Sequence, residues 1–346
     1  MKRIALFIYC LIIFYSCKHI HEGPDTSGLY AETVVRRFDK DFFSMDTLRM
    51  DQELNRLNSR YPNFFQGYLV KILGVNPNDP QATEAIKGFI RSYRPVYNAS
   101  EKMAGENLEG LQKDVEKSLK LMQAYVPGWK PDSPFVITTF IGPMDAFEPF
   151  PLGDYGDVRT ANGVGIALQL HLGNKQQVYE DGRQAGIFFD YQVRRFTPET
   201  MAVNSIKNII VDAFPYNASG TTLVEEMVEK GKRMYLLDKL MPETPDSLKF
   251  GYTEAQVKGC YENEALIWNY FVKNDLLFSK ESSVNQAYIK DGPKTAELGE
   301  GAPGYIGLFT GLQVVRNYMK KNPGTTITAL MKIPAKQLFD EAGYKP

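Results

Sequence analysis

Two predicted helices that follow one another within residues 197–236 constrain the fold more than any other stretch. The segment reads TPETMAVNSIKNIIVDAF, a short PYNASG break, and then TTLVEEMVEKGKRMYL. Thr197 and Pro198 suit the start of the first helix, and Thr222 with Glu225 forms a capping box for the second. Helices joined by so short a turn must bury a face against each other or against a neighbour. We therefore expect the rest of the chain to be organised around this pair.

One side of the first helix is apolar at helical spacing, and the other side is polar. The polar side carries Asn204, Ser205 and Asn208. The second helix carries Glu225 and Glu229 one turn apart. The sequence thus places polar side chains of the first helix near acidic side chains of the second, and their purpose is the functional question that it raises.

The N-terminus predicts a signal peptide over residues 1–16. Lys2 and Arg3 precede an apolar run, Ile4–Tyr15, which is too short to span a bilayer and has the length of a signal sequence. Ser16 before Cys17 resembles a bacterial lipobox. Acyl chains such as palmitate on Cys17 would anchor the protein, because each buried CH₂ contributes about 0.8 kcal/mol. The alternative is an ordinary signal peptide with an incidental cysteine.

Charge and residue usage exclude several classes of function. Removal of residues 1–16 takes away two basic residues, which leaves 38 basic and 41 acidic ones, too balanced to indicate a nucleic-acid partner. Beyond residue 30 the chain has one histidine, His171, and one cysteine, Cys260, so it cannot build the usual histidine- or cysteine-rich zinc sites. We therefore expect no cofactor and no metal, and a structural role for His171.

The remaining pattern predicts an α+β fold that is mainly helical. Residues 17–30 are a polar, lipid-bearing tether, and 31–126 are a helical N-terminal region. Residues 127–346 form an α+β region with strands at 135–141 and 163–173, and we expect it to make one compact unit with 31–126. Glycines at 304, 307 and 311 line one face of a later helix, which predicts that another backbone packs closely there.

The order of the predicted elements is similar to that of a gluzincin-type metallopeptidase. In that class two histidines one turn apart bind zinc, the glutamate between them is the base, and a glutamate on the next helix is the third ligand. Here Asn204-Ser205-Ile206-Lys207-Asn208 stands in place of that HExxH motif, with asparagines for the histidines and Ser205 for the base. Glu229 stands where the third ligand would be. The resemblance implies a degenerate active-site cleft.

A series of segments along nearly all of the mature chain points to a more specific family. They are the lipobox-like start, VVRRFDKDFF, Leu172-Gly173, Tyr191-Gln192, RFTPE, EKGKRMYLLDKLMP, GYTEAQ, ENEALIWNYF and PGYIGLFTGLQVVRNYM. In their order and spacing the chain resembles the gliding motility-associated lipoprotein GldB family of the Bacteroidetes. The resemblance implies a lipoprotein on a peptidase-like scaffold, anchored in the envelope at the outer membrane and facing the periplasm. It also implies a link to gliding motility in species that glide.

Two functional hypotheses follow. The first is a pseudo-enzyme with no catalytic residues, which uses the degenerate cleft to bind an envelope protein or peptide. Neutral amides bind Zn²⁺ poorly compared with imidazole, and no base is present at Ser205. The second is a metal-independent hydrolase, because paired acids can act as acid and base when burial raises one pKa. Its candidate acids are Glu225, Glu229, Glu262 and Glu264.

Overall fold

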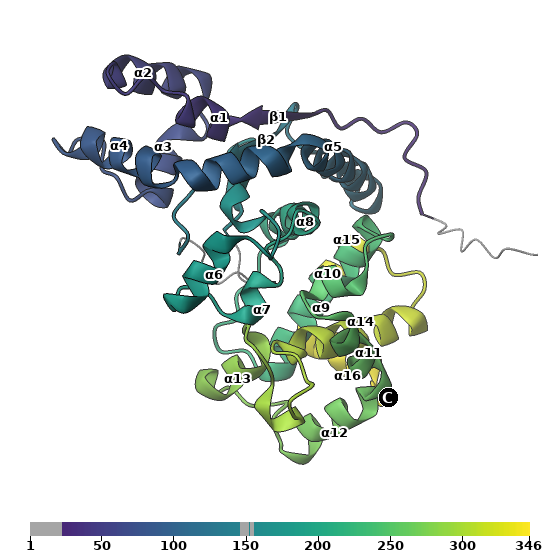
Figure 1. Ribbon diagram of the computed structural model, residues 1–346. Helices are drawn as coiled ribbons and strands as arrows, with labels where there is room; N and C mark the ends of the chain where they lie inside the picture. Colours follow the sequence, from purple (N-terminus) through teal and green to yellow (C-terminus); the bar gives the residue numbers. More distant parts are fainter. Residues whose placement is uncertain (1–22, 146–151, 153–155) are drawn as a thin grey trace, which may run out of the picture.

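Helices from both halves of the chain surround one small sheet (Figure 1). The computed structural model describes residues 23–145, 152 and 156–346. The predicted class, mainly helical with a small sheet, is confirmed. None of the helices in these residues is long and apolar enough to cross a membrane.

The sheet is mixed, with the strand order β1-β2-β4-β3. Its strands are β1 (Thr33–Arg37), β2 (Phe135–Phe140), β3 (Val158–Thr160) and β4 (Gly163–Ala167). The first two and β4 run parallel, whereas β3 is antiparallel to β4. Every residue of β2 is buried, as expected for a central strand covered on both faces.

The structure corrects the predicted strands. Only two strands were predicted, whereas the stretch VVRRFDKDFF supplies a further one, β1, which pairs with β2. The second predicted strand ends at Ala167, and Leu168–Leu170 form a 3₁₀ turn. This turn leads the chain out of the sheet to His171.

The N-terminal lobe, residues 38–97, is built on aromatic packing. The Phe38 ring lies 4.7 Å from the Tyr68 ring and 5.0 Å from the Phe64 ring, centroid to centroid. The lobe contains α1 (Phe38–Phe43), α2 (Met50–Arg60), α3 (Phe65–Gly67), a π-helical turn (Tyr68–Ile72), α4 (Ala82–Ser92) and the start of α5 (Arg94–Tyr125).

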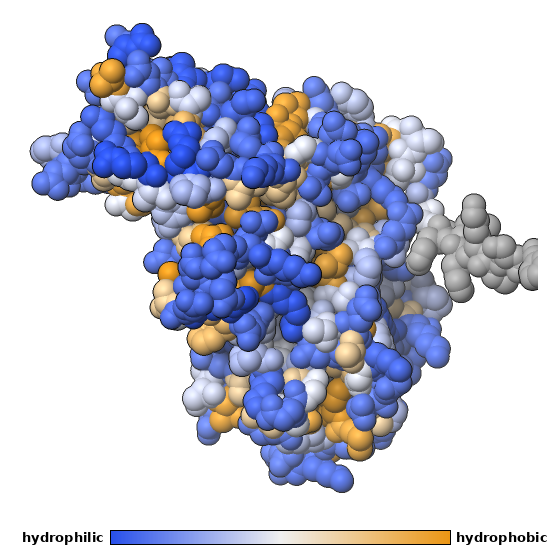
Figure 2. Space-filling view, in the orientation of Figure 1, coloured by the Kyte–Doolittle hydropathy of each residue, from blue (hydrophilic) through white to orange (hydrophobic). Residues whose placement is uncertain are grey.

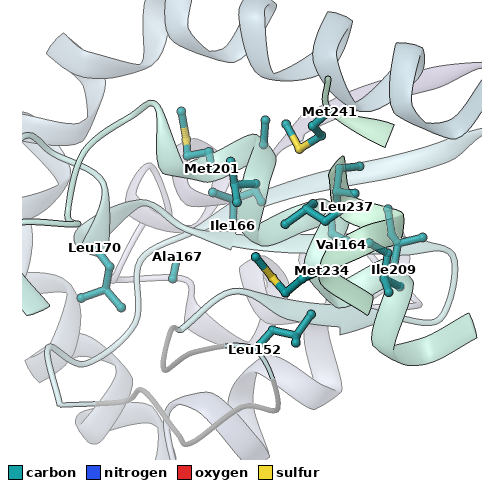
Figure 3. Close-up of a cluster of buried hydrophobic side chains, with 14 of the residues drawn as sticks. Leu152, Val164, Ile166, Ala167, Leu170, Met201, Ile209, Met234, Leu237 and Met241 are labelled. Atoms are coloured by element: carbon teal, nitrogen blue, oxygen red, sulfur yellow. The ribbon is translucent and has the colours of Figure 1, made fainter. Parts of the chain in front are cut away.

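The second half is almost entirely helical. Its helices are α6 (Gln177–Gln184), α7 (Asp190–Val193), α8 (Thr200–Ala213), α9 (Leu223–Leu240), α10 (Asp246–Phe250), α11 (Glu254–Glu262), α12 (Glu264–Lys273), α13 (Ser282–Ile289), α14 (Ile306–Lys321), α15 (Ile327–Lys332) and α16 (Ala335–Ala342). The predicted pair corresponds to α8 and α9. Apolar side chains of both helices meet those of β4 in one buried cluster (Figure 3).

Close backbone contact between α9 and α14 is the tightest feature of this half. A Cβ on Gly311 would lie 1.8 Å from the main-chain oxygen of Met227, so only glycine fits. This confirms the predicted close approach at Gly311. Gly307 and Gly304 contact different backbones, those of Tyr288 and Gly292, and Gly304 precedes the helix rather than lining its face.

The two capping predictions for the helix pair have different outcomes. The carboxylate of Glu225 accepts hydrogen bonds from the main-chain N–H of Thr222 at 2.8 Å and from its hydroxyl at 2.7 Å, so the start of α9 is confirmed. The first helix begins at Thr200 rather than beside Thr197. Residues 197–199 instead form a turn in which the carbonyl of Thr197 accepts a hydrogen bond from the N–H of Thr200.

Candidate functional site

The polar side of α8 closes around one buried carboxylate, that of Asp157. This residue directly precedes β3 and is 4% exposed. Its oxygens accept hydrogen bonds from the N–H of Ala167 at 2.8 Å, from Nε2 of His171 at 2.9 Å and from Nδ2 of Asn204 at 3.0 Å. Nδ2 of Asn208 lies 3.4 Å from the Asp157 carbonyl. Three donors on one buried carboxylate satisfy it thoroughly.

His171 joins Asp157 to the N-terminus of α8. Its Nδ1 lies 3.0 Å from the Thr200 hydroxyl and 3.2 Å from the Thr197 carbonyl. The Thr200 hydroxyl also lies within hydrogen-bond distance of the carbonyls of Thr197 and Arg195. Both ring nitrogens of His171 therefore have partners within the fold, Nε2 at Asp157 and Nδ1 at the first turn of α8. The expected structural role of His171 agrees with this geometry.

Ser205 and Lys207 lie on α8 between the two asparagines. The Ser205 side chain is buried, and its hydroxyl donates to the Met201 carbonyl at 2.8 Å, one turn back along the helix. Nζ of Lys207 donates to the Leu152 carbonyl at 3.0 Å. Burial, followed by the positive charge of Arg195, lowers the pKa of Lys207 to about 7.

Glu229 on α9 neutralises two buried cations of its own helix. Its carboxylate lies 2.7 Å from Nζ of Lys232 and 2.9 Å from a guanidinium nitrogen of Arg233. Arg233 also donates from Nε to the Phe214 carbonyl at 2.9 Å, just after the end of α8. Glu229 thereby helps to hold the end of α8 against α9.

The residues of the predicted cleft do not form one centre in the structure. The side-chain amides of Asn204 and Asn208 both contact Asp157. Ser205 donates a hydrogen bond within its own helix, and Glu229 forms ion pairs with Lys232 and Arg233. No hydrogen bond or ion pair among residues 23–145, 152 and 156–346 joins Glu229 to the other three positions.

These side chains do not fit a zinc ion. The Asn204 amide already donates to Asp157, and the Glu229 carboxylate is bound to two cations. In the part of the chain that the structure describes, no three His, Cys, Asp or Glu side chains are grouped so that they could hold a metal ion.

The other acids considered for hydrolysis also have separate partners. Glu225 caps α9, Glu262 lies 3.7 Å from Nζ of Lys258, and Glu264 accepts a hydrogen bond from the Tyr344 hydroxyl. None of these contacts brings two of the named carboxylates together, as acid–base catalysis by a pair would need.

Asp157 is the residue of this site that sequence reasoning missed. Asp157 is one of several acids in the sequence between β2 and β3, a segment that lacks the spacing of an EF-hand calcium loop. Its hydrogen-bond partner Asn204 lies 47 positions further along the chain, and no local sequence pattern predicts a contact over that separation. For Glu229 a signal did exist, because Lys232 and Arg233 follow at the i+3 and i+4 spacing of helical ion pairs.

A separate pocket of about 570 Å³ lies between α11, α12 and the segment before α14. Cys260 lies at its inner side, and burial raises the pKa of this thiol to about 12, so it is not a reactive thiolate. None of the predicted cleft residues lines this pocket.

Comparison with known proteins identifies one relationship. The model of the family described as gliding motility protein GldB matches residues 20–346. No curated protein and no solved structure matches the chain. Since the family match covers almost the whole sequence, the chain belongs to the GldB family of gliding motility proteins.

Proposed function

We propose that the protein is a non-catalytic lipoprotein that binds a protein or peptide partner in the cell envelope. Acyl chains on Cys17 hold it at the outer membrane, with the folded part in the periplasm. In species that glide, this binding serves assembly of the gliding apparatus. Family membership and the lipobox-like sequence before Cys17 support the proposal.

One observation carries the non-catalytic part of the proposal. The Asn204 amide donates to a carboxylate that also binds His171 and the Ala167 N–H, so the position of a first metal ligand is used to hold the fold together. Ser205, at the position of the base, is buried and has no acid–base group to offer. On this view α8 and α9 are a peptidase-like hairpin that has lost its metal-binding residues.

The metal-independent hydrolase is the alternative, and no contact favours it. The acids proposed for it cap a helix, neutralise neighbouring cations or bond to Tyr344. The carboxylate of Glu229 is already paired with Lys232 and Arg233, so it is not placed to act on a substrate.

Complementation tests the proposal. A gliding strain that lacks the protein is supplied with the wild type, Ser205→Ala or Glu229→Gln, and spreading on agar is measured together with the abundance of each variant. We expect both variants to restore spreading wherever their abundance matches the wild type. If either variant is abundant and the cells do not spread, the substituted group performs a chemical step and the non-catalytic account fails.

Cross-linking in the native envelope tests the binding part. Wild-type protein should be captured with a specific envelope protein, and Ser205→Ala should be captured with the same one. Recovery of no specific partner by the functional wild type would contradict a binding role.

A further inference from the structure

A basic pocket on the N-terminal lobe is not explained by the helix pair or by the lipid anchor. Its volume is about 330 Å³, and it lies where α4 meets α5, next to the loop before α2. Its lining residues are Thr47, Lys87, Ile90, Arg91 and Arg94. Three of the five side chains are therefore cationic.

Aromatic rings hold one of the arginines in place. The guanidinium carbon of Arg94 lies 5.3 Å from the centre of the Phe43 ring and 5.6 Å from that of Tyr97. These two rings are stacked, with centroids 4.8 Å apart. A guanidinium held against rings keeps its N–H groups directed along its edge, where an oxyanion can accept two hydrogen bonds at once.

Among the residues that the structure describes, only one of the three cations of the pocket has a carboxylate partner. Neither Arg91 nor Arg94 has a hydrogen bond or an ion pair with any other residue that the structure describes. Glu84 pairs with Lys87 of the pocket itself at 2.9 Å, which leaves the two arginines. Two other nearby acids have cations outside the pocket, since Asp46 lies 2.7 Å from Arg49 and Glu101 pairs with Arg37.

An apolar side chain stands beside this charge. Leu48 directly follows Thr47 and is 93% exposed, the highest value among the large apolar residues of the described chain. A cation cluster next to an exposed apolar side chain is the combination with which proteins contact membrane surfaces, because phosphates attract the cations and the acyl region takes up the apolar group.

The position of the lobe suits such a contact. In Figure 1, α2 and α4 lie at the upper left of the molecule, and the chain that precedes β1 leaves the upper part of the molecule toward the right. Figure 2 shows that the outer surface of the lobe is largely hydrophilic. A chain tethered near residue 17 would meet its own membrane at a high effective concentration, so even weak headgroup binding would orient it.

We propose that the pocket formed by Lys87, Arg91 and Arg94 binds the phosphate of an anionic phospholipid headgroup in the membrane that carries the anchor, with Leu48 inserted beside it. The inference rests on the anchoring part of the proposed function and is independent of whether the α8–α9 pair is catalytic. The contact would hold the N-terminal lobe against the bilayer and present the remainder of the protein to the periplasm.

Vesicle sedimentation tests this proposal. The mature chain from residue 17, with Cys17→Ala so that no lipid is attached, is mixed with vesicles of phosphatidylcholine alone or of phosphatidylcholine with phosphatidylglycerol. We expect preferential binding to the anionic vesicles that weakens as salt is added. Arg91→Ala should weaken binding about fivefold, the effect of about one cation near such a surface. Leu48→Ala, combined with Arg91→Ala, should weaken vesicle binding further than Arg91→Ala alone.

Two matched controls keep the test decisive. The pair Lys273→Ala and Lys290→Ala removes exposed cations near α12 and α13, on the lower side in Figure 1, and should leave vesicle binding unchanged. Arg94 also packs on aromatic rings, so a substitution there could disturb the fold as well as the charge. The second control is therefore Arg94→Lys, which keeps the charge, and its thermal unfolding is compared with that of the wild type to detect a folding defect.

Three results would overturn the proposal. They are equal binding to both kinds of vesicle, an equal loss of binding in the control pair, and saturable binding of inorganic phosphate by a protein that does not bind vesicles. The last result would identify the ligand as a soluble phosphate compound rather than a membrane lipid. All three readouts leave the complementation test of the α8–α9 pair unaffected.

Discussion

Nε2 of His171 lies 2.9 Å from Oδ2 of Asp157, and both side chains are buried. This contact joins the residue before β3 to the residue that follows the 3₁₀ turn after β4, and Asn204 completes it from α8. A polar network of this kind is stabilising only while every member has a partner. Its components therefore give sharp predictions about stability.

Asn204→Asp should destabilise the fold because it replaces the donor toward Asp157 with a second carboxylate. We expect a loss of about 3 kcal/mol in the free energy of unfolding at pH 7, measured with urea, and partial recovery in mild acid where one carboxylate takes up a proton. Asn204→Ala, the control, removes only a hydrogen bond and should lose about 1–2 kcal/mol. Equal stability of Asn204→Asp and the wild type would show that the contact is absent.

Gly311→Ala should be among the most damaging single substitutions. The added Cβ would lie 1.8 Å from the Met227 main-chain oxygen, and a backbone cannot move aside as a flexible side chain can. We expect a loss of about 3 kcal/mol or more, seen in thermal or urea unfolding. Gly110→Ala in α5 has nothing within 4 Å and should gain about 0.5–1 kcal/mol. Similar effects at the two positions would contradict the close α9–α14 contact.

Local signals explain which parts of the fold could be predicted from the sequence. The start of α9 was predictable because Thr222 and Glu225 bond to each other within one turn. The end of the strand at Ala167 was not, because the apolar alternation continues through the 3₁₀ turn that follows. Strand β1 was missed because Val35 pairs with Ile137, a partner that no local pattern identifies.

The same distinction applies to the candidate site. The polar positions Asn204, Ser205 and Asn208 were found from the helical period alone. Their meaning was not, because it depends on Asp157, which reaches them from another part of the fold. Long-range polar contacts of this kind are set by tertiary packing rather than by spacing along the chain.

Lys207 should make stability depend on pH above neutrality. Burial lowers its pKa from 10.5 to about 7, so between these values the unfolded chain binds a proton that the folded chain does not. The free energy of unfolding therefore rises with pH across this interval, by up to about 1.4 kcal/mol per pH unit, and this contribution is lost as pH falls toward 7. Urea unfolding of the wild type and Lys207→Met at pH 7, 8 and 9 measures it. Parallel pH profiles of the two proteins would contradict the burial of a neutral lysine.

Cys17→Ala should release the protein from the membrane fraction after a wash at high salt, because the acyl chains hold it far more strongly than headgroup contacts do. Cys17 lies outside the described residues, and its role is predicted from the sequence. Cys10→Ala, within the predicted signal peptide, is the matched control and should leave the mature protein anchored. Retention of Cys17→Ala in the washed membranes would mean that something other than lipid on this cysteine holds the protein.

The central claim is that α8 and α9 carry a polar network in place of a metal centre. Elemental analysis of the protein purified without chelators tests it most directly, because the gluzincin-like arrangement requires one zinc ion per chain. Our account predicts far less than one equivalent of zinc, because Asn204 is bound to Asp157 and Glu229 to Lys232 and Arg233. One full equivalent of zinc, lost together with folding stability on substitution of Asn204 or Glu229, would contradict it.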